Sequence, residues 1–168
     1  MTDNDTKDAA AEQPEQFEGD GPVMLALSTF RRSEEAEDKA IELMGDGGRL
    51  IIVYVADVDV ARRLVGSDVG VFEGLKEMTE RELMKEYMER GMKAEKRLVE
   101  RAHRMGAVNV QSRVEIGHFA NEVLKDVEKY KPKVIVTTRS SRPAWVRKLF
   151  GSHVDVIHKK TGCPVIEA

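Results

Sequence analysis

Lys133-Val-Ile-Val-Thr-Thr-Arg-Ser-Ser-Arg-Pro-Ala-Trp-Val-Arg-Lys-Leu-Phe-Gly-Ser152 is the stretch of sequence from which the fold can be worked out. It opens on a short apolar run, residues 134–136, which is typical of a buried strand. It continues as a loop rich in hydroxyl groups and arginines. It ends at Ser152, which together with Asp155 predicts a capping box at the start of a helix. A strand that leads through a basic loop to a helix N-terminus is suited to hold an anion.

The charge of the chain is distributed unevenly. The whole chain has a formal net charge of -3, but residues 1–21 hold seven acidic residues and one basic residue. Residues 138–160 hold six basic residues and one acidic residue, so the positive charge gathers on the stretch quoted above and on the helix predicted after it. Clustered Lys and Arg also suit nucleic acid, which we keep as an alternative partner of the basic loop. No nucleic-acid-binding motif accompanies the cluster, so nucleic acid is not the expected partner.

Length and composition predict one soluble domain. The chain has 168 residues, of which 41% are hydrophobic and 34% charged. No apolar run reaches the roughly 20 residues that span a bilayer, and the acidic N-terminus does not resemble a signal peptide. We therefore expect a cytoplasmic protein with no membrane contact. Residues 1–21 are expected to form a disordered acidic tail, either a solubilising extension or an arm that shields the basic loop, and residues 22–168 the folded domain.

Strand and helix patterns alternate along the chain. Strands are predicted at residues 23–27, 50–56, 108–116, 134–136 and 163–167, and helices at residues 33–44, 78–105, 118–130 and 152–160. Residues 57–77 are expected to form a partly ordered connection, because glycines interrupt them. Strict alternation predicts an α/β fold, an open five-stranded parallel sheet with helices on both faces.

The third strand locates the ligand site. It alternates apolar and polar residues, which predicts an edge position and favours the strand order 3-2-1-4-5. The order then reverses between the first and fourth strands, and ligands of such sheets bind beyond the carboxyl ends of the strands at that point. The loops there begin with Ser28-Thr29 and Thr137-Thr138.

Two short motifs near the end of the chain suggest a family. Gly151-Ser152 precedes a predicted helix, and Cys163-Pro164-Val165 follows it. In this spacing, residues 23–166 resemble the universal stress proteins, in which a strand leads to Gly-x2-Gly-x9-Gly-Ser/Thr, a helix and Cys-Pro-Val. The resemblance implies a Rossmann-like, adenine nucleotide alpha hydrolase-like fold and a role in the stress response. It also implies a homodimer paired through the last strand, with Cys163, Pro164, Val165 and Ile166 at the interface.

The resemblance further implies where ATP, with Mg²⁺, would bind. By position, Ser28 stands where many ATP-binding members have Asp, and the backbone of Val55 would face adenine. Thr138 and Ser141 replace the first two loop glycines, so only the final Gly-Ser of the pattern is kept. The candidate nucleotide-binding residues are Ser28, Thr29, Val55, Thr138, Arg139, Ser141, Arg142, Gly151 and Ser152.

The replaced glycines change the expected function. Glycine allows a positive φ and a close approach of backbone to phosphate, whereas another residue in the left-handed region costs about 1–2 kcal/mol. Arg139 and Arg142 could instead contact phosphate directly. The sequence favours a dimeric stress protein that acts through protein contacts with weak or no nucleotide binding. The alternative is an ATP-binding member with a modified loop, with slow hydrolysis at most.

Metal and covalent chemistry find no support in the sequence. The single cysteine, Cys163, allows no internal disulfide, and its spacing from His153 and His158 matches no zinc pattern. No Gly-x-Ser-x-Gly motif is present, and no pair of carboxylates can be assigned to a site. We therefore predict no metal site and no catalytic residue.

Overall fold

The computed structural model describes residues 17, 19–31, 33–66, 73–139 and 152–168, with side chains of the longest helix described from residue 79 onward. Its sheet has five parallel strands in the order β3-β2-β1-β4-β5. The strands are β1 (Val23–Ser28), β2 (Arg49–Asp57), β3 (Asn109–Gly117), β4 (Val134–Thr137) and β5 (Val165–Glu167). The predicted strand order and the edge position of the third strand are confirmed.

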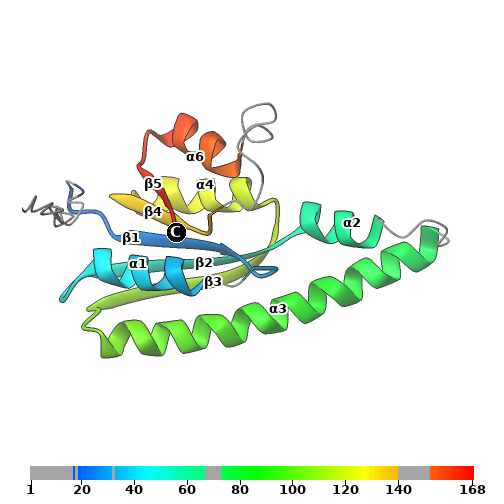
Figure 1. Cartoon of the computed structure of the whole chain (residues 1–168), viewed down its shortest axis with the longest axis horizontal. Coiled ribbons are helices and arrows are strands. Elements are labelled where there is room, and N and C mark those ends of the chain that lie inside the picture. The colour runs from blue at the N-terminus through cyan, green and yellow to red at the C-terminus, as the bar shows by residue number, and fades with distance from the viewer. Residues whose placement is uncertain (1–16, 18, 32, 67–72, 140–151) are drawn as a thin grey trace, which may run out of the picture.

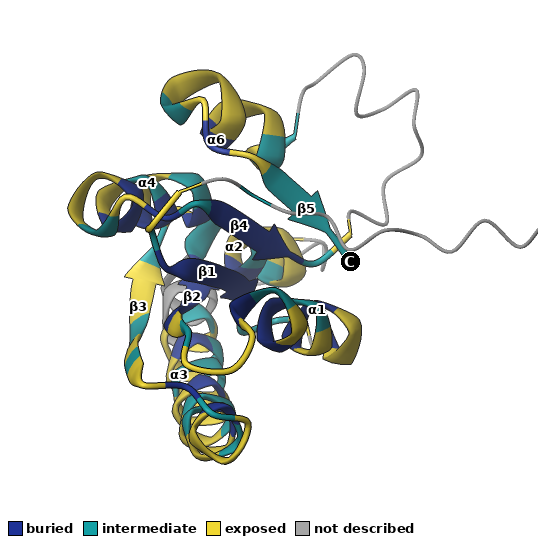
Figure 2. Ribbon diagram, turned by 90° about the vertical axis from the view of Figure 1, so that its left-hand side faces the viewer, coloured by how far each residue is buried: buried dark blue, intermediate teal, exposed yellow. Residues whose placement is uncertain are grey.

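Helices cover both faces of the sheet (Figures 1 and 2). They are α1 (Glu34–Met44), α2 (Val58–Gly66), α3 (Glu73–Arg104), α4 (Phe119–Tyr130) and α6 (His153–Thr161). One hydrophobic core lies between the sheet and helices α1 and α3, and a second lies between the sheet and helices α4 and α6. The predicted α/β architecture is therefore confirmed.

Strand β1 holds the two cores together. It pairs with β2 on one side and with β4 on the other. Its side chains alternate between the cores, with Leu25 in the first and Met24 in the second, and both are completely buried. A strand buried on both faces must be apolar throughout, which is why the run from Val23 to Leu27 contains no polar residue.

A buried carboxylate lies within the first core. The carboxylate of Glu37, on α1, is 3% exposed and accepts hydrogen bonds from Nη2 of Arg97 at 2.8 and 2.9 Å. It also accepts one from the hydroxyl of Tyr54 at 3.3 Å. These bonds join α1, α3 and β2, and they satisfy a charge that would otherwise be costly to bury.

The region expected to be an irregular connection is largely helical, so that expectation is wrong for its described part. Residues 58–66 form α2, and α3 begins at Glu73 rather than near residue 78. Asp57 starts α2 by accepting the Asp59 amide at 2.9 Å. A third small core, which contains Ala61 and Met84, then holds α2 against α3. This tertiary packing outweighs the glycines that suggested irregular structure.

The last strand differs in detail from its prediction, and the apolar stripe along α3 is buried only in part. Strand β5 begins at Val165 rather than at Cys163. Core packing of the α3 stripe holds for Met84, Leu98 and Ala102, which are buried, but Met92 is 48% exposed. Helix α3 extends past the carboxyl ends of the strands, where only α2 is available to cover it (Figure 1).

Gly91 allows α3 to lie directly on the sheet. A Cβ atom at this position would lie 2.7 Å from Cγ2 of Thr29 and 2.8 Å from Cγ1 of Val114. Both neighbours are β-branched side chains with little rotamer freedom. The absence of a side chain at Gly91 therefore sets how closely α3 approaches the end of β1.

We expect Gly91→Ala to destabilise the protein by about 1 kcal/mol, because overpacking of about 1–3 kcal/mol outweighs the helix-propensity gain of about 1 kcal/mol. Urea unfolding measures this. Gly66→Ala is the control, because a Cβ there meets no atom of the described residues within 4 Å, and it should leave stability unchanged or higher. A Gly91→Ala variant as stable as the parent would show that α3 is not packed this closely.

Candidate functional site

The point of strand reversal brings several of the predicted residues together. Ser28 ends β1 and Thr29 follows it, while Thr138 and Arg139 follow β4, the neighbouring strand. The amide of Thr29 donates to the carbonyl of Val55 at 2.9 Å, which extends the pairing of β1 with β2. These five residues therefore share the carboxyl edge of the sheet. The other predicted loop residues, Ser141, Arg142 and Gly151, lie outside the described residues.

Two of the candidates already have hydrogen-bond roles within the fold. The Ser28 hydroxyl accepts the amide of Phe30 at 3.3 Å, so it stabilises the turn that follows β1. Val55 is completely buried, and its carbonyl oxygen accepts the Thr29 amide. An adenine ring that used the backbone of Val55 would have to share this carbonyl.

Thr29 and Thr138 have hydroxyl groups that the fold leaves unused. Both Oγ1 atoms are buried, and neither has a hydrogen-bond partner in the described part of the chain. A buried hydroxyl without a partner costs about 1–3 kcal/mol. Buried polar atoms are nearly always paired, so two such atoms at the ends of neighbouring strands call for an explanation, such as a ligand.

Arg31 connects the two loops at this edge. Its Nη1 donates to the carbonyl of Arg139 at 3.2 Å, although the two residues lie 108 positions apart. The amide of Arg139 donates to the carbonyl of Ala168 at 2.9 Å, and the hydroxyl of Ser33 donates to the same carbonyl at 3.3 Å. Sequence reasoning missed Arg31, because a single basic residue in a loop does not show what it contacts.

An aromatic pair lies beside the same turn. Phe30 and Tyr87 stack with their ring centroids 3.8 Å apart, and the guanidinium of Arg90 lies 5.0 Å from the Tyr87 centroid. Phe30 comes from the turn after β1, and Tyr87 comes from α3. The sequence pattern gave no signal for this pairing, because the two residues lie 57 positions apart.

The predicted capping box at the start of α6 is confirmed. The Ser152 hydroxyl accepts the Asp155 amide at 3.0 Å, and the Ser152 amide donates to the Asp155 carboxylate at 2.9 Å. The box places a negative charge in the first turn of the helix. That charge opposes an incoming phosphate and weakens the anion-holding power of this helix terminus.

His118 and Asp59 join the start of α4 to α2. The Nδ1 atom of His118 lies 2.9 Å from Oδ2 of Asp59, and both side chains are about half exposed. The hydrogen bond from His118 lowers the pKa of Asp59 below its usual value, aided by the nearby charges of Arg63 and Arg62.

The thiol of Cys163 has a structural role. It is buried and lies 3.3 Å from the carbonyl of Pro132, to which it donates, and burial raises its pKa. Within the described residues, no three His, Cys, Asp or Glu side chains gather closely enough to hold a metal ion. No helix in this part of the chain is both long and apolar enough to cross a membrane.

The fold described above is that of an α/β domain with an open parallel sheet. Residues 21–166 match the model of the Universal stress protein family. The chain therefore belongs to the universal stress protein family. No curated protein matches the sequence significantly.

Solved structures with this fold are distant in sequence. Universal stress protein UspA from Lactobacillus plantarum is 15% identical with a TM-score of 0.61, covering 87% of this chain and 96% of that one. A universal stress protein in complex with cAMP is 13% identical with a TM-score of 0.54, covering 88% and 96%. A family protein from Arabidopsis thaliana with AMP bound is 12% identical with a TM-score of 0.54, covering 87% and 90%. At these identities the likeness establishes the fold.

We expect Thr29→Val and Thr138→Val each to stabilise the ligand-free protein by about 1 kcal/mol, because valine has the same shape and no unpaired hydroxyl. Thr161→Val is the matched control. Its hydroxyl donates to the Ile157 carbonyl at 2.8 Å and accepts the Cys163 amide at 3.1 Å, so its loss should destabilise by about 1 kcal/mol. Denaturant unfolding without ligand measures all three. Destabilisation in the first two variants would mean that their hydroxyls are paired in solution.

Proposed function

We propose that this protein acts in the stress response as a cytoplasmic homodimer. It works through contacts with other proteins and binds an adenine nucleotide weakly at the point of strand reversal. The observation that carries the ligand part is that the buried hydroxyls of Thr29 and Thr138 have no hydrogen-bond partner among the described residues. The complexes of relatives with cAMP and with AMP support an adenine nucleotide as the ligand class.

The residues at this edge have distinct roles in the proposal. The hydroxyls of Thr29 and Thr138 donate to ribose or phosphate oxygens, which are the acceptors they lack. Arg31 and Arg139 supply positive charge to the phosphates, Arg31 by exchanging the carbonyl that it now contacts for a charged acceptor. Ser28, Val55, Ser141, Arg142, Gly151 and Ser152 complete the proposed site. Mg²⁺ would accompany the phosphates of ATP, and the proposal assigns no hydrolysis.

Three features support weak rather than tight binding. Thr138 stands where the family pattern has a glycine, so the loop backbone approaches phosphate less closely. The carbonyl of Val55 is already bonded to the amide of Thr29. The carboxylate of Asp155 occupies the first turn of α6, which would otherwise favour an anion.

A titration of the dimer with AMP, cAMP and ATP with Mg²⁺, by calorimetry or ligand-detected NMR, tests the proposal. We expect dissociation constants of about 1 mM, near -4 kcal/mol, and weaker binding in the Thr29→Val, Thr138→Val double variant. Lys93→Gln, on the exposed face of α3, is the control and should bind as the parent does. No binding at millimolar nucleotide would overturn the ligand part, and micromolar binding would overturn the weak-binding part.

The dimer part of the proposal concerns β5. This strand has three residues, Val165–Glu167, pairs only with β4 among the described strands, and is half-buried. An edge strand with apolar residues needs a covering partner, and a second copy in antiparallel pairing across a two-fold axis supplies one. The proposed interface is Cys163, Pro164, Val165 and Ile166.

We expect Val165→Pro to convert the dimer to a monomer at micromolar concentration, as measured by analytical ultracentrifugation. Ala168 donates its amide to Thr137 of β4, so by alternation along the strand the amide of Val165 points to the outer edge. Proline removes that donor without breaking the pairing with β4. Val165→Ala keeps the amide and should remain dimeric. A parent protein that sediments as a monomer would contradict the proposal.

A further inference from the structure

A second group of basic residues lies at the amino edge of the sheet, at the opposite end from the proposed nucleotide site. Arg49 begins β2, Lys131 and Lys133 precede β4, and two lysines occupy the last turn of α6. We call these the amino-edge cluster: Arg49, Lys131, Lys133, Lys159 and Lys160. It was not apparent from the sequence, because its members come from three separate segments.

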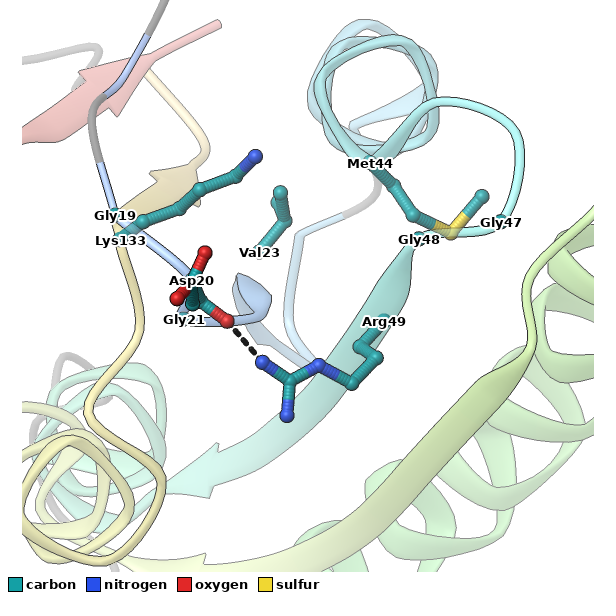
Figure 3. A pocket seen from close by; sticks show the side chains of 9 residues that line it. All are labelled: Gly19, Asp20, Gly21, Val23, Met44, Gly47, Gly48, Arg49 and Lys133. Atoms are coloured by element: carbon teal, nitrogen blue, oxygen red, sulfur yellow. Dashed lines mark hydrogen bonds between the residues drawn. The ribbon is translucent and has the colours of Figure 1, made fainter.

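A hydrogen bond and a shared hollow bring these segments together. Lys131 and Lys133 flank Pro132, whose carbonyl accepts the Cys163 thiol just after the end of α6. Arg49 and Lys133 line one hollow of about 200 Å³, together with residues 19–21 (Figure 3). Arg49 and Lys133 therefore lie together, and the chain just after α6 contacts the residue between Lys131 and Lys133.

The cluster has little negative charge to balance it. None of its five members forms an ion pair with another described residue, whereas Arg97, Arg101 and Arg113 elsewhere on the body all do. The guanidinium of Arg49 donates to the carbonyl of Asp20, not to a carboxylate. Asp20 is the one acidic residue that lines the hollow.

The N-terminal segment enters the body at this cluster. Phe17 packs against the first core, and the Pro22 carbonyl accepts the Lys133 amide at 3.0 Å. Gly21 passes so close that a Cβ there would lie 2.4 Å from the Lys131 carbonyl oxygen and 2.7 Å from the Lys133 nitrogen. Only glycine permits this approach, so residues 1–16 start from a point beside the cluster.

The charge and length of residues 1–16 suit the cluster. They have a net charge of -4, whereas the amino-edge cluster has five positive charges. The charged residues of the segment are Asp3, Asp5, Asp8, Glu12, Glu15 and Lys7. Sixteen residues can reach at most about 50–60 Å, so every cation of the cluster is accessible. A tethered partner acts at an effective concentration in the millimolar range, which lets weak pairings form.

We propose that residues 1–16 lie against the amino-edge cluster and shield it from other polyanions. The sequence suggests, as one alternative, an acidic arm that shields the basic loop after β4. The amino-edge cluster is a different surface, because the N-terminal segment leaves the body at the opposite edge of the sheet. The occupant is the protein's own acidic segment. A polyanion such as nucleic acid, or the acidic segment of a second copy, is an alternative that the tests below separate.

A spin label at residue 6 of the full chain tests the contact. Thr6→Cys can be labelled selectively, because the native thiol of Cys163 is buried and burial raises its pKa. We expect the amide signals of Arg49, Lys131 and Lys133 to lose intensity at about 10 mM salt. They should recover at about 1 M salt, because the screening length falls from about 30 to about 3 Å.

Matched variants identify the cations responsible. Lys131→Gln with Lys133→Gln should reduce the loss of intensity at Arg49, while Lys93→Gln with Lys96→Gln on α3 should leave it unchanged. No loss at low salt, or a loss centred on Arg139 and Ser152, would overturn the proposal. A mixture of spin-labelled chains with separate isotope-labelled chains tests for contact between two copies. If the loss of intensity occurs only in that mixture, the acidic segment contacts a second copy, and the proposal is overturned.

Affinity for heparin tests the shielding. In the five-amide variant of the full chain, the acids at positions 3, 5, 8, 12 and 15 are changed to the corresponding amides. We expect this variant to elute from heparin at higher salt than the parent. Adding Lys131→Gln and Lys133→Gln should cancel that shift, and adding Lys93→Gln and Lys96→Gln should not. Equal elution of the parent and the five-amide variant would overturn shielding.

Discussion

The whole structure depends on the position of β1, which is hydrogen-bonded on both sides and buried on both faces. Such a strand can carry no charged side chain, so the polar groups near it lie at its ends. At its carboxyl end, Ser28 and Thr29 meet the end of β4 because the strand order reverses there. At its amino end, Gly21 and Pro22 pass against residues 131–133. The central strand thus defines two polar edges, one at each end.

The carboxyl edge combines stabilising and costly features. Arg31 bonds across it to the carbonyl of Arg139, while the hydroxyls of Thr29 and Thr138 remain unpaired and buried within the described structure. A loop built on glycines would offer backbone amides to a phosphate, and this chain offers hydroxyl and guanidinium groups instead. These groups are the basis of the weak nucleotide binding that we propose. Helix α3 closes its flank, because Gly91 lets the helix rest on Thr29.

The two edges differ in how their positive charge is balanced. At the carboxyl edge, Arg31 contacts backbone oxygen and Asp155 adds a carboxylate to the start of α6. At the amino edge, four of the five cations are exposed and Lys133 is partly buried, and an acidic segment enters beside them. Helix dipoles add to this difference, because α4 and α6 end at the amino edge, where lysines interact favourably with the helix C-termini. In our two proposals, a nucleotide and a polyanion would therefore bind at opposite edges of one domain.

The sequence by itself determined the strand order, the edge position of β3 and the capping box at Ser152, because each depends on local periodicity or on spacing along the chain. It also placed Thr29 and Thr138 at the point of reversal. It did not predict α2, the buried Glu37 or the bond of Arg31 to Arg139, since each depends on groups far apart in the chain. The pairing of a hydroxyl and the gathering of separate lysines both depend on which residues lie close together in space. Only the packing of the helices on the sheet could decide them.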